Sequence, residues 1–334
     1  MAEINDSLQR PLRDLRISLT DVCNFRCNYC MPPEYDYKFL NEKQRMNFEE
    51  IIRFVKIFKK LGVERIRLTG GEPLLRPDIE EIVAAISEVE GLKDIALTTN
   101  GQLLAKHASR LKAAGLKRVT VSLDAVDPFA FKKMSGGRGS YRSVMEGIDE
   151  AITQGLTPLK VNAVIEKNIN EEQVLPLVRF AKEKGVTVRF IEFMDVGNKN
   201  NWHKEDVLSS KEILQLIETE FEVEPKDPAF YGEVASHYKF KAGEGGIGLI
   251  SSVTQPFCSS CTRGRLSAQG HLYTCLFATE GNDLLTFMRN GLNDDEILGL
   301  IQGVWQKRED RYSEERFNQK HRRHGKVEMF HIGG

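Results

Sequence analysis

Three cysteines near the N-terminus, Cys23, Cys27 and Cys30, form a C-x-x-x-C-x-x-C motif. This spacing supplies three thiolates from one tight loop. A 4Fe–4S cubane usually takes four cysteines, so three leave one iron without a protein ligand. The motif therefore predicts a redox centre with one iron open for chemistry. A structural zinc site is the alternative, but it needs a fourth ligand, and the nearest histidine is His107, far along the chain.

A second group of three cysteines, Cys258, Cys261 and Cys275, repeats the C-x-x-C core near the C-terminus. No cysteine lies between the two groups, so the six are badly distributed for a disulfide framework. Two clusters with this core predict two metal sites in a reducing compartment. For the second group, a zinc hairpin completed by His271 is the alternative.

Two arginines, Arg263 and Arg265, follow the second C-x-x-C motif at alternate positions. In an extended segment they point to the same side, and guanidinium groups suit phosphate recognition by paired hydrogen bonds. A solvated charge pair is the alternative. The formal net charge of the chain is only −1, so an anionic ligand must be held by such a local cluster. Nothing global points to nucleic acid or to an acidic membrane surface.

The elements that must position these residues follow a regular alternation. Strands are expected at 15–19, 64–68, 95–99, 118–123, 159–165 and 186–194, with helices at 49–62, 79–91, 104–115, 144–155 and 174–185. Such alternation demands right-handed crossovers and a parallel sheet. Six units without a Rossmann glycine pattern predict a barrel or a partly open one, with ligands at the C-terminal ends of its strands. The first cysteines and several polar or glycine-rich turns follow those ends.

The alternation stops after about residue 222, and this change divides the chain into two predicted regions. We expect the barrel at 1–222 and a lid or small domain at 223–334, with a charged helical segment at about 294–320. The N-terminus has no apolar signal segment, and no run approaches the ~20 apolar residues of a membrane span. We expect a cytoplasmic protein with no membrane contact.

Beyond these patterns, the segment CNFRCNYC resembles the signature of the radical S-adenosylmethionine (SAM) superfamily. The turn Gly70-Gly71-Glu72-Pro73 is similar to the glycine-rich turn of that superfamily, which binds the amino group of SAM. Glycine permits a close backbone approach, and Glu72 is expected to accept from the ammonium. The resemblance implies that the open iron chelates SAM and that its reductive cleavage gives a 5′-deoxyadenosyl radical.

The likeness extends over essentially the whole chain to one family, GTP 3′,8-cyclase, also called molybdenum cofactor biosynthesis protein A. It is carried, in order, by RPLRDLRISLTDVCNFRCNYCMP, RLTGGEPLLR, IALTTNG, VSLDA, RFIEFMDVGN, QPFCSSCTRGRLSAQGHLYTCLF and a C-terminal Gly-Gly. One departure is Gly264, where Ala is expected between the arginines. The resemblance implies an α/β fold, an incomplete (β/α)6-type radical SAM barrel with a C-terminal cluster-binding extension.

The resemblance also implies roles for individual residues. The expected contacts to SAM are Tyr29, Gly71, Ser122 and Met194. The expected contacts to GTP are Arg16, Arg67, Thr98, Lys160, Arg189, Arg263, Gly264 and Arg265. The expected catalytic residues are Arg263, Arg265, Gly333 and Gly334, the two glycines because the tail reaches into the active site of that family. The strand pattern supports part of this set, since Arg67, Lys160 and Arg189 alternate with apolar neighbours.

The implied reaction is the cyclisation of GTP to (8S)-3′,8-cyclo-7,8-dihydroguanosine 5′-triphosphate, an early step of molybdenum cofactor biosynthesis. It would use SAM, two 4Fe–4S clusters, of which the second binds the guanine base, and an external electron donor. A cyclic pyranopterin monophosphate synthase would take the product, and a homodimer is possible in such a family. Two alternatives stay open: another twin-cluster radical SAM enzyme that matures a peptide, and a zinc-stabilised protein without catalysis.

Overall fold

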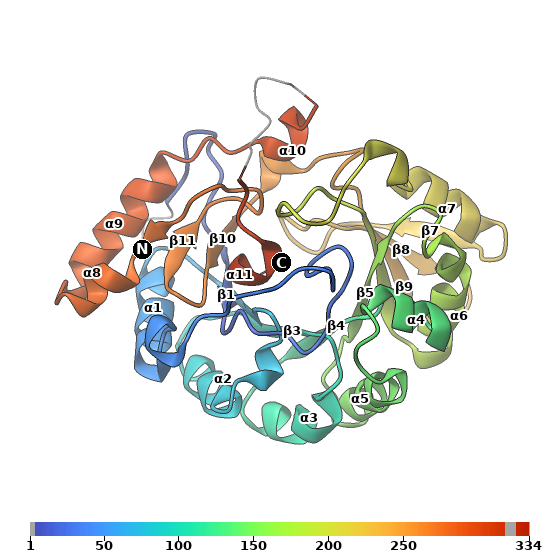
Figure 1. Cartoon of the computed structure of the whole chain (residues 1–334), viewed down its shortest axis with the longest axis horizontal. Helices are drawn as coiled ribbons and strands as arrows, with labels where there is room; N and C mark the ends of the chain where they lie inside the picture. The colour runs from blue at the N-terminus through green and yellow to red at the C-terminus, as the bar shows by residue number, and fades with distance from the viewer. Residues whose placement is uncertain (1–3, 318–324, 334) are drawn as a thin grey trace.

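The centre of the molecule is a curved parallel sheet whose strands follow one another in chain order. In the computed structural model, which describes residues 4–317 and 325–333, the helices lie around the outside of this sheet (Figure 1). The central strands are β1 (Asp14–Ser18), β2 (Arg65–Thr69), β3 (Asp94–Thr99), β4 (Arg118–Ser122), β5 (Lys160–Ile165) and β6 (Thr187–Glu192). All five pairings between neighbouring strands are parallel. The predicted incomplete (β/α)6 barrel is therefore confirmed.

Amphipathic helices connect these strands and bury their apolar faces on the sheet. They are α1 (Phe48–Lys60), α2 (Ile79–Ser87), α3 (Leu104–Ala113), α4 (Pro128–Met134), α5 (Tyr141–Thr153) and α6 (Val174–Lys184). The expected glycines end them: Gly62, Gly115 and Gly185 have φ of 100°, 98° and 65°. These left-handed conformations are cheap only for glycine. The five predicted helices are confirmed, and the short α4 is an addition that the pattern did not indicate.

The C-terminal region joins the same sheet at both edges. Its elements are α7 (Ser210–Glu218), β7 (Val223–Lys226), β8 (Ser236–Phe240), β9 (Gly246–Ile250), β10 (Arg263–Leu266), β11 (His271–Tyr273), β12 (Asn282–Asp283), α8 (Leu285–Arg289), α9 (Asp294–Gln306), α10 (Tyr312–Glu315) and α11 (Met329–Ile332). Strand β10 pairs in parallel with β1, and β9 pairs in parallel with β6. Strands from beyond residue 222 thus flank the barrel on each side within one sheet.

The shorter helical turns complete the element order. They are η1 (Glu42–Gln44), η2 (Pro73–Leu75), η3 (Glu171–Gln173), η4 (Lys204–Asp206) and η5 (Cys258–Ser260). The expected helical segment at about 294–320 contains two helices, since α9 ends at Gln306 and α10 begins at Tyr312. Between them the chain turns inward, where Arg308 is almost completely buried and hydrogen-bonded. Residues 318–320 lie outside the described part.

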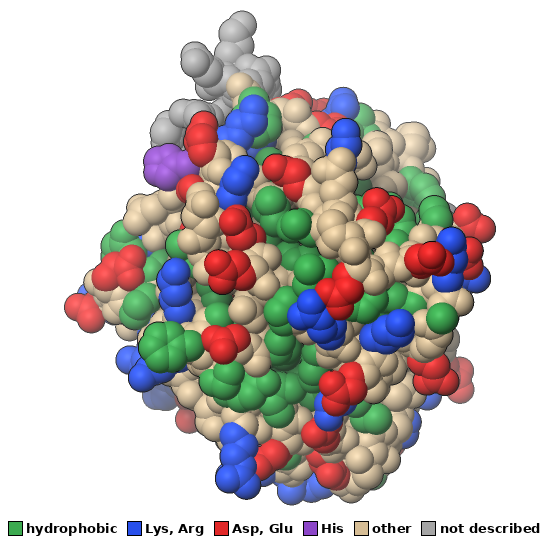
Figure 2. Space-filling view, turned by 90° about the vertical axis from the view of Figure 1, so that its right-hand side faces the viewer, with side chains coloured by type: hydrophobic (Ala, Val, Ile, Leu, Met, Phe, Trp, Pro, Cys, Tyr) green, Lys and Arg blue, Asp and Glu red, His purple; other side chains and the backbone are tan. Residues whose placement is uncertain are grey.

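Two surface features bear on function. The face that carries α6 and α7 shows Lys, Arg, Asp and Glu side chains interspersed around exposed apolar groups, with no single-sign field (Figure 2). No helix among the described residues is both long enough and apolar enough to cross a membrane. The cavity inside the barrel, in contrast, gathers several arginine side chains.

Candidate active site

One cavity at the open end of the barrel brings both cysteine groups together. Its walls include all six cysteines, and about 1820 Å³ between them is not filled by protein atoms, part of it open to solvent. The first group follows β1, and the second lies in the segments before β10 and after β11. Ten of the other predicted site residues line the same cavity: Arg16, Tyr29, Arg67, Gly71, Thr98, Ser122, Arg189, Met194, Arg263 and Arg265.

Of the other four predicted residues, three are described, and none of these three lines the cavity. Lys160 is at the start of β5, on the same face of the strand as Asn162, which does line the cavity. A Cβ on Gly264 would lie 3.1 Å from Leu12 Cδ1, so this residue faces the apolar layer outside the barrel and not the cavity. Its close packing accounts for Gly in place of the expected Ala. Gly333 touches the rim through the tail, and Gly334 lies outside the described residues.

The first cysteine loop is partly buried and faces carboxylates. Burial and the nearby Glu72 raise the pKa of the Cys23 thiol to about 11. Burial and Asp124 raise the pKa of Cys27 as well. The Tyr29 hydroxyl donates to Asp124 Oδ2 at 3.0 Å, which fixes the aromatic ring beside the loop. A cysteine thiolate here needs an electropositive partner, and the iron of a cluster supplies one.

The glycine turn after β2 holds this loop through close backbone contact. A Cβ on Gly71 would lie 2.2 Å from the carbonyl oxygen of Val22, and the Gly71 N–H donates to Thr20 O at 2.6 Å. Glu72 does not line the cavity. Its carboxylate accepts from Thr99 Oγ1 and from the Asn100 N–H, both at 2.7 Å. The glutamate thus ties the turn to β3, a use that differs from the expected ammonium contact.

Arginines from the neighbouring strands β10, β1 and β2 and from β6, on the other side of the barrel, line the cavity. Arg16 lies between Arg67 and Arg265 in the register of β2, β1 and β10. Burial lowers the pKa of Arg67 to about 10, and burial together with Arg67 lowers the pKa of Arg189 to about 9. No hydrogen bond or ion pair among the described residues involves the guanidinium of Arg16, whose pKa is lowered by burial and by Arg265. Uncompensated positive charge at this depth needs an anionic ligand.

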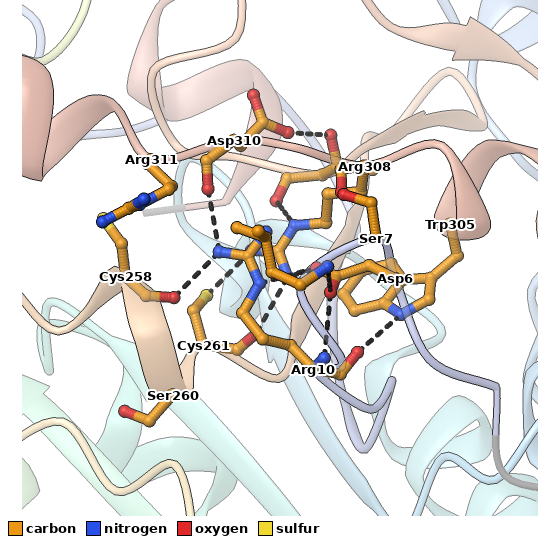
Figure 3. Close-up of polar contacts among 12 residues, drawn as sticks. Asp6, Ser7, Arg10, Cys258, Ser260, Cys261, Trp305, Arg308, Asp310 and Arg311 are labelled. Atoms are coloured by element: carbon orange, nitrogen blue, oxygen red, sulfur yellow. Dashed lines mark hydrogen bonds and ion pairs between the residues drawn. The ribbon is translucent and has the colours of Figure 1, made fainter.

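The second cysteine group is embedded in cations. Cys261 Sγ accepts from Arg263 Nη2 at 3.5 Å and from Arg308 Nη2 at 3.1 Å. Burial alone would raise the pKa of the Cys261 thiol, but these guanidiniums lower it to about 6. The residue is therefore poised as a thiolate, the form that binds iron. Figure 3 shows this loop with the polar residues behind it.

Neither histidine that the zinc alternatives require lies where it could complete a zinc site with the cysteines. His271 does not line the cavity, and its Nε2 lies 3.8 Å from Asp283 Oδ1. His107, on α3, pairs with Glu80 at 2.8 Å. Among the described residues, no three His, Cys, Asp or Glu side chains are grouped to hold one metal ion. A cubane binds each cysteine to a different iron and needs no such convergence, so three cysteines without a fourth side-chain ligand fit an open-site cluster.

The C-terminal tail reaches the rim of the cavity. Helix α11 contacts β1 and lies at the centre of the barrel mouth (Figure 1). Gly333 has φ of 69°, its carbonyl accepts from Arg265 Nη1, and a Cβ there would lie 2.4 Å from Thr69 Cγ2. Only glycine fits this path, as expected for a tail threading a narrow site.

Sequence patterns missed Arg308, which lines the cavity and bonds to Cys261. Arg308 is one of several charged residues in its segment, and its spacing from the cysteines matches no motif. Asp124 closes β4 in the VSLDA segment, so its place at a strand end was a usable signal. Asn162, which accepts from Arg189 Nε at 2.8 Å, could have been found from its alternation with Lys160 on β5.

Comparisons with known proteins agree with this geometry. The Radical SAM superfamily profile matches residues 17–209, and the Molybdenum Cofactor Synthesis C profile matches residues 186–314. A GTP 3′,8-cyclase of Staphylococcus haemolyticus (strain JCSC1435) is 46% identical over 340 residues, which cover 100% of each chain. A GTP 3′,8-cyclase of Staphylococcus carnosus (strain TM300) is 46% identical over 338 residues, 99% of each chain.

Among solved structures, methylornithine synthase aligns with a TM-score of 0.50 and 19% identity over 62% of each chain, a likeness of fold alone. The relatives that align over their full length support a more specific family assignment than the fold alone does. An open parallel barrel, two three-cysteine groups on one cavity and relatives aligned end to end lead to one conclusion: the chain belongs to the GTP 3′,8-cyclase family of the radical SAM superfamily.

Proposed function

We propose that this chain is a radical SAM enzyme that cyclises GTP to (8S)-3′,8-cyclo-7,8-dihydroguanosine 5′-triphosphate, early in molybdenum cofactor biosynthesis. The observation that carries the proposal is the single cavity, in which two open three-cysteine sets face a group of inward arginines. A cluster that binds SAM and a cluster that binds an anionic nucleotide can share this space. The full-length relatives named GTP 3′,8-cyclase support the same substrate.

In this proposal the first cluster is held by Cys23, Cys27 and Cys30, at the end of β1. Four residues that line the cavity would contact SAM: Tyr29, Gly71, Ser122 and Met194. When bound and reduced, this pair would supply a 5′-deoxyadenosyl radical that takes the hydrogen atom from ribose C3′ of GTP. C3′ would then bond to guanine C8, and one electron from the external donor with one proton would complete the 7,8-dihydro product. The protein's own part is to fix the adenine beside Tyr29 and to keep the reacting groups out of bulk water.

The second cluster would be held by Cys258, Cys261 and Cys275 and would bind the guanine base. The GTP residues comprise the inward cations, one hydroxyl and the glycine between two of the arginines: Arg16, Arg67, Thr98, Lys160, Arg189, Arg263, Gly264 and Arg265. Thr98 Oγ1 accepts from Arg67 Nη1 at 3.0 Å, which orients that guanidinium. Lys160 does not line the cavity but interacts electrostatically with Arg189 and Arg67, so it would add to the positive charge that holds the triphosphate, and Gly264 can take part only through its backbone.

The tail completes the proposed site. Arg265 binds the Gly333 carbonyl, so the arginine and the tail order each other at the rim. We assign catalytic roles to Arg263, Arg265, Gly333 and Gly334, because these residues would surround the sugar and base after the nucleotide binds. Such positioning of reactants is worth large factors in rate.

The proposal extends to partners and organisation. Residues 1–222 would serve the first cluster and residues 223–334 the second. An external donor would supply electrons, a cyclic pyranopterin monophosphate synthase would receive the product, and a homodimer is possible. The cytoplasm, a reducing compartment, suits exposed thiolates and clusters.

The test is anaerobic incubation of cluster-reconstituted protein with SAM, a reductant and GTP, followed by mass analysis of the nucleotide. We expect 5′-deoxyadenosine and a cyclised nucleotide of the same mass as GTP, with different retention. SAM cleavage with unchanged GTP would contradict GTP as the substrate. It would instead favour the alternative of a radical SAM enzyme that matures a peptide. Colourless protein that contains zinc would contradict both.

A further inference from the structure

Arg308 joins the parts of the second cysteine group from behind. Its Nε donates to Thr274 O at 3.1 Å, next to Cys275, and its Nη1 donates to Cys261 O at 2.8 Å. Its Nη2 donates to Cys261 Sγ at 3.1 Å. One planar guanidinium therefore fixes the segment of Cys275 relative to that of Cys261.

A buried carboxylate from the N-terminal segment holds this arginine in place. Asp6 Oδ2 accepts from Arg308 Nη1 at 3.2 Å and from Arg10 Nε at 2.6 Å. The Nη1 of Arg10 in turn donates to Cys258 O at 2.8 Å (Figure 3). The side chains of Asp6 and Arg10 are 0% exposed, and that of Arg308 is 2% exposed. All three cysteine segments are thus tied to one buried Asp6–Arg10–Arg308 network.

An aromatic side chain limits the movement of the network. Trp305 is fully buried, its ring lies 4.6 Å from the Arg308 guanidinium, and its Nε1 donates to Arg10 O at 3.1 Å. Four N–H bonds of Arg308 go to protein atoms, out of the five donors that a guanidinium has. Little donor capacity is left for a nucleotide, so this arginine differs from the inward arginines of the strands.

We propose that Arg308, held by Asp6, is a positioning residue that fixes the second cysteine group and raises the reduction potential of the cluster it holds through the hydrogen bond to Cys261 Sγ. The inference rests on the proposed function, which places a cluster at these cysteines. Reduction adds one negative charge to a cluster, and hydrogen bonds to its sulfurs stabilise that charge. A cationic donor does so more strongly than a neutral one.

The test uses the full chain with Cys23, Cys27 and Cys30 replaced by Ser, so that only the second cluster is reconstituted. In this background we compare Arg308→Gln, Arg308→Lys and Asp6→Asn. Lys307→Gln is the matched control, because Lys307 directly precedes Arg308 in the chain, carries the same charge and is exposed. Iron per chain and an EPR-monitored redox titration are measured without SAM or GTP.

We expect Arg308→Gln to shift the midpoint potential to more negative values, or to lose most of the roughly four irons per chain while the fold is kept. Arg308→Lys keeps the charge but not the fork of bonds, so an intermediate result is expected. Asp6→Asn loosens the hold on Arg308 and Arg10 and should therefore lower the iron content. Lys307→Gln should match the parent in both measurements.

Equal potentials and iron contents in Arg308→Gln and the parent would overturn the inference, as would equal shifts in Arg308→Gln and Lys307→Gln. An unchanged iron content in Asp6→Asn would overturn the role of Asp6 in holding Arg308. If Arg308→Gln does not fold, Arg308→Lys decides, since unchanged iron and potential there would also contradict the proposal. A parent that binds no iron would instead overturn the proposed function together with this inference.

Discussion

The two cysteine groups line one cavity but meet opposite charges. Glu72 and Asp124 face the first group, and with burial they raise the pKa values of Cys23 and Cys27. Arg263 and Arg308 face the second group and lower the pKa of Cys261 to about 6. The contrast with the first group rests on Cys261 and not on the whole second group, because burial and Asp310 raise the pKa of Cys275 to about 11.

This difference in charge explains how one cavity can hold two unlike ligands, each on its own side. SAM carries a sulfonium and an ammonium, so the carboxylate side favours it. GTP carries a triphosphate, so the arginine side favours it. Charge complementarity of this kind contributes more to placement and to rejection of the wrong ligand than to raw affinity. The proposed division between the clusters therefore has an electrostatic basis as well as a covalent one.

The largest expected effect separates the two groups directly. Cys27→Ser should abolish SAM cleavage, because the first cluster loses one of three protein ligands. Cys261→Ser should keep some uncoupled SAM cleavage and abolish nucleotide cyclisation. Both products are quantified in anaerobically reconstituted protein, with iron content as the control. Identical behaviour of the two variants would remove the division of labour.

The next effect concerns the tail between the two sides. Deletion of 333–334 should leave folding, iron content and GTP binding near normal and reduce cyclisation about 100-fold, the order expected when reactants lose their alignment. Gly333→Ala should act in the same direction, because its Cβ would meet Thr69 Cγ2 at 2.4 Å. Gly325→Ala is the matched control, since Gly325 also has positive φ, 75°, but a Cβ there would meet no atom of the described residues within 4 Å. Full turnover by the truncated chain would refute a catalytic role for the tail.

A smaller effect tests the cationic side. Arg263→Ala and Arg265→Ala should each weaken GTP binding about 10- to 100-fold, from a loss of about 1.5–3 kcal/mol per charge-assisted contact. SAM binding should not change. Arg110→Ala is a suitable control, because Arg110 is 63% exposed on α3 and pairs with Glu80. Binding is measured by anaerobic titration, and unchanged GTP affinity in both variants would reassign these arginines to structure.

The smallest effect is a pH dependence from Lys160. Burial and Arg189 lower the pKa of this amine to about 8, so it is charged below pH 8 and neutral above it. Only the charged form attracts phosphate. GTP affinity should therefore fall between pH 7 and pH 9 by up to about tenfold, the change in the charged fraction across one unit on each side of the pKa. Lys160→Arg should flatten this fall, and an equally steep fall in that variant would exclude Lys160 as the titrating group.

Much of the barrel could be predicted from the sequence because local periodicity determines it. The strands, the helices and the glycines that end them depend on neighbours a few residues away. The partners of β9 and β10 could not be predicted, since their pairing with β6 and β1 depends on contacts between distant segments. The break after Gln306 has the same origin, because Arg308 turns inward to meet Asp6.

The site divides in the same way. Cysteine spacing and the alternation of Arg67 and Arg189 with apolar residues indicated which side chains enter the cavity. Arg308 could not be found, because its partners lie far from it in the chain and no local pattern joins them. Glu72 shows the opposite case. Its motif identified it as a ligand contact, but its carboxylate is hydrogen-bonded to β3 and does not line the cavity.

One isotope measurement tests most directly whether the two sides of the cavity act on each other. GTP with deuterium at C3′ is incubated anaerobically with SAM, reductant and reconstituted protein, and the 5′-deoxyadenosine is analysed by mass spectrometry. Since SAM and GTP are placed in one cavity, we predict one deuterium in each 5′-deoxyadenosine, in proportion to the cyclised nucleotide formed. Cyclised nucleotide accompanied by unlabelled 5′-deoxyadenosine would contradict direct hydrogen transfer and, with it, the shared cavity as the site of reaction.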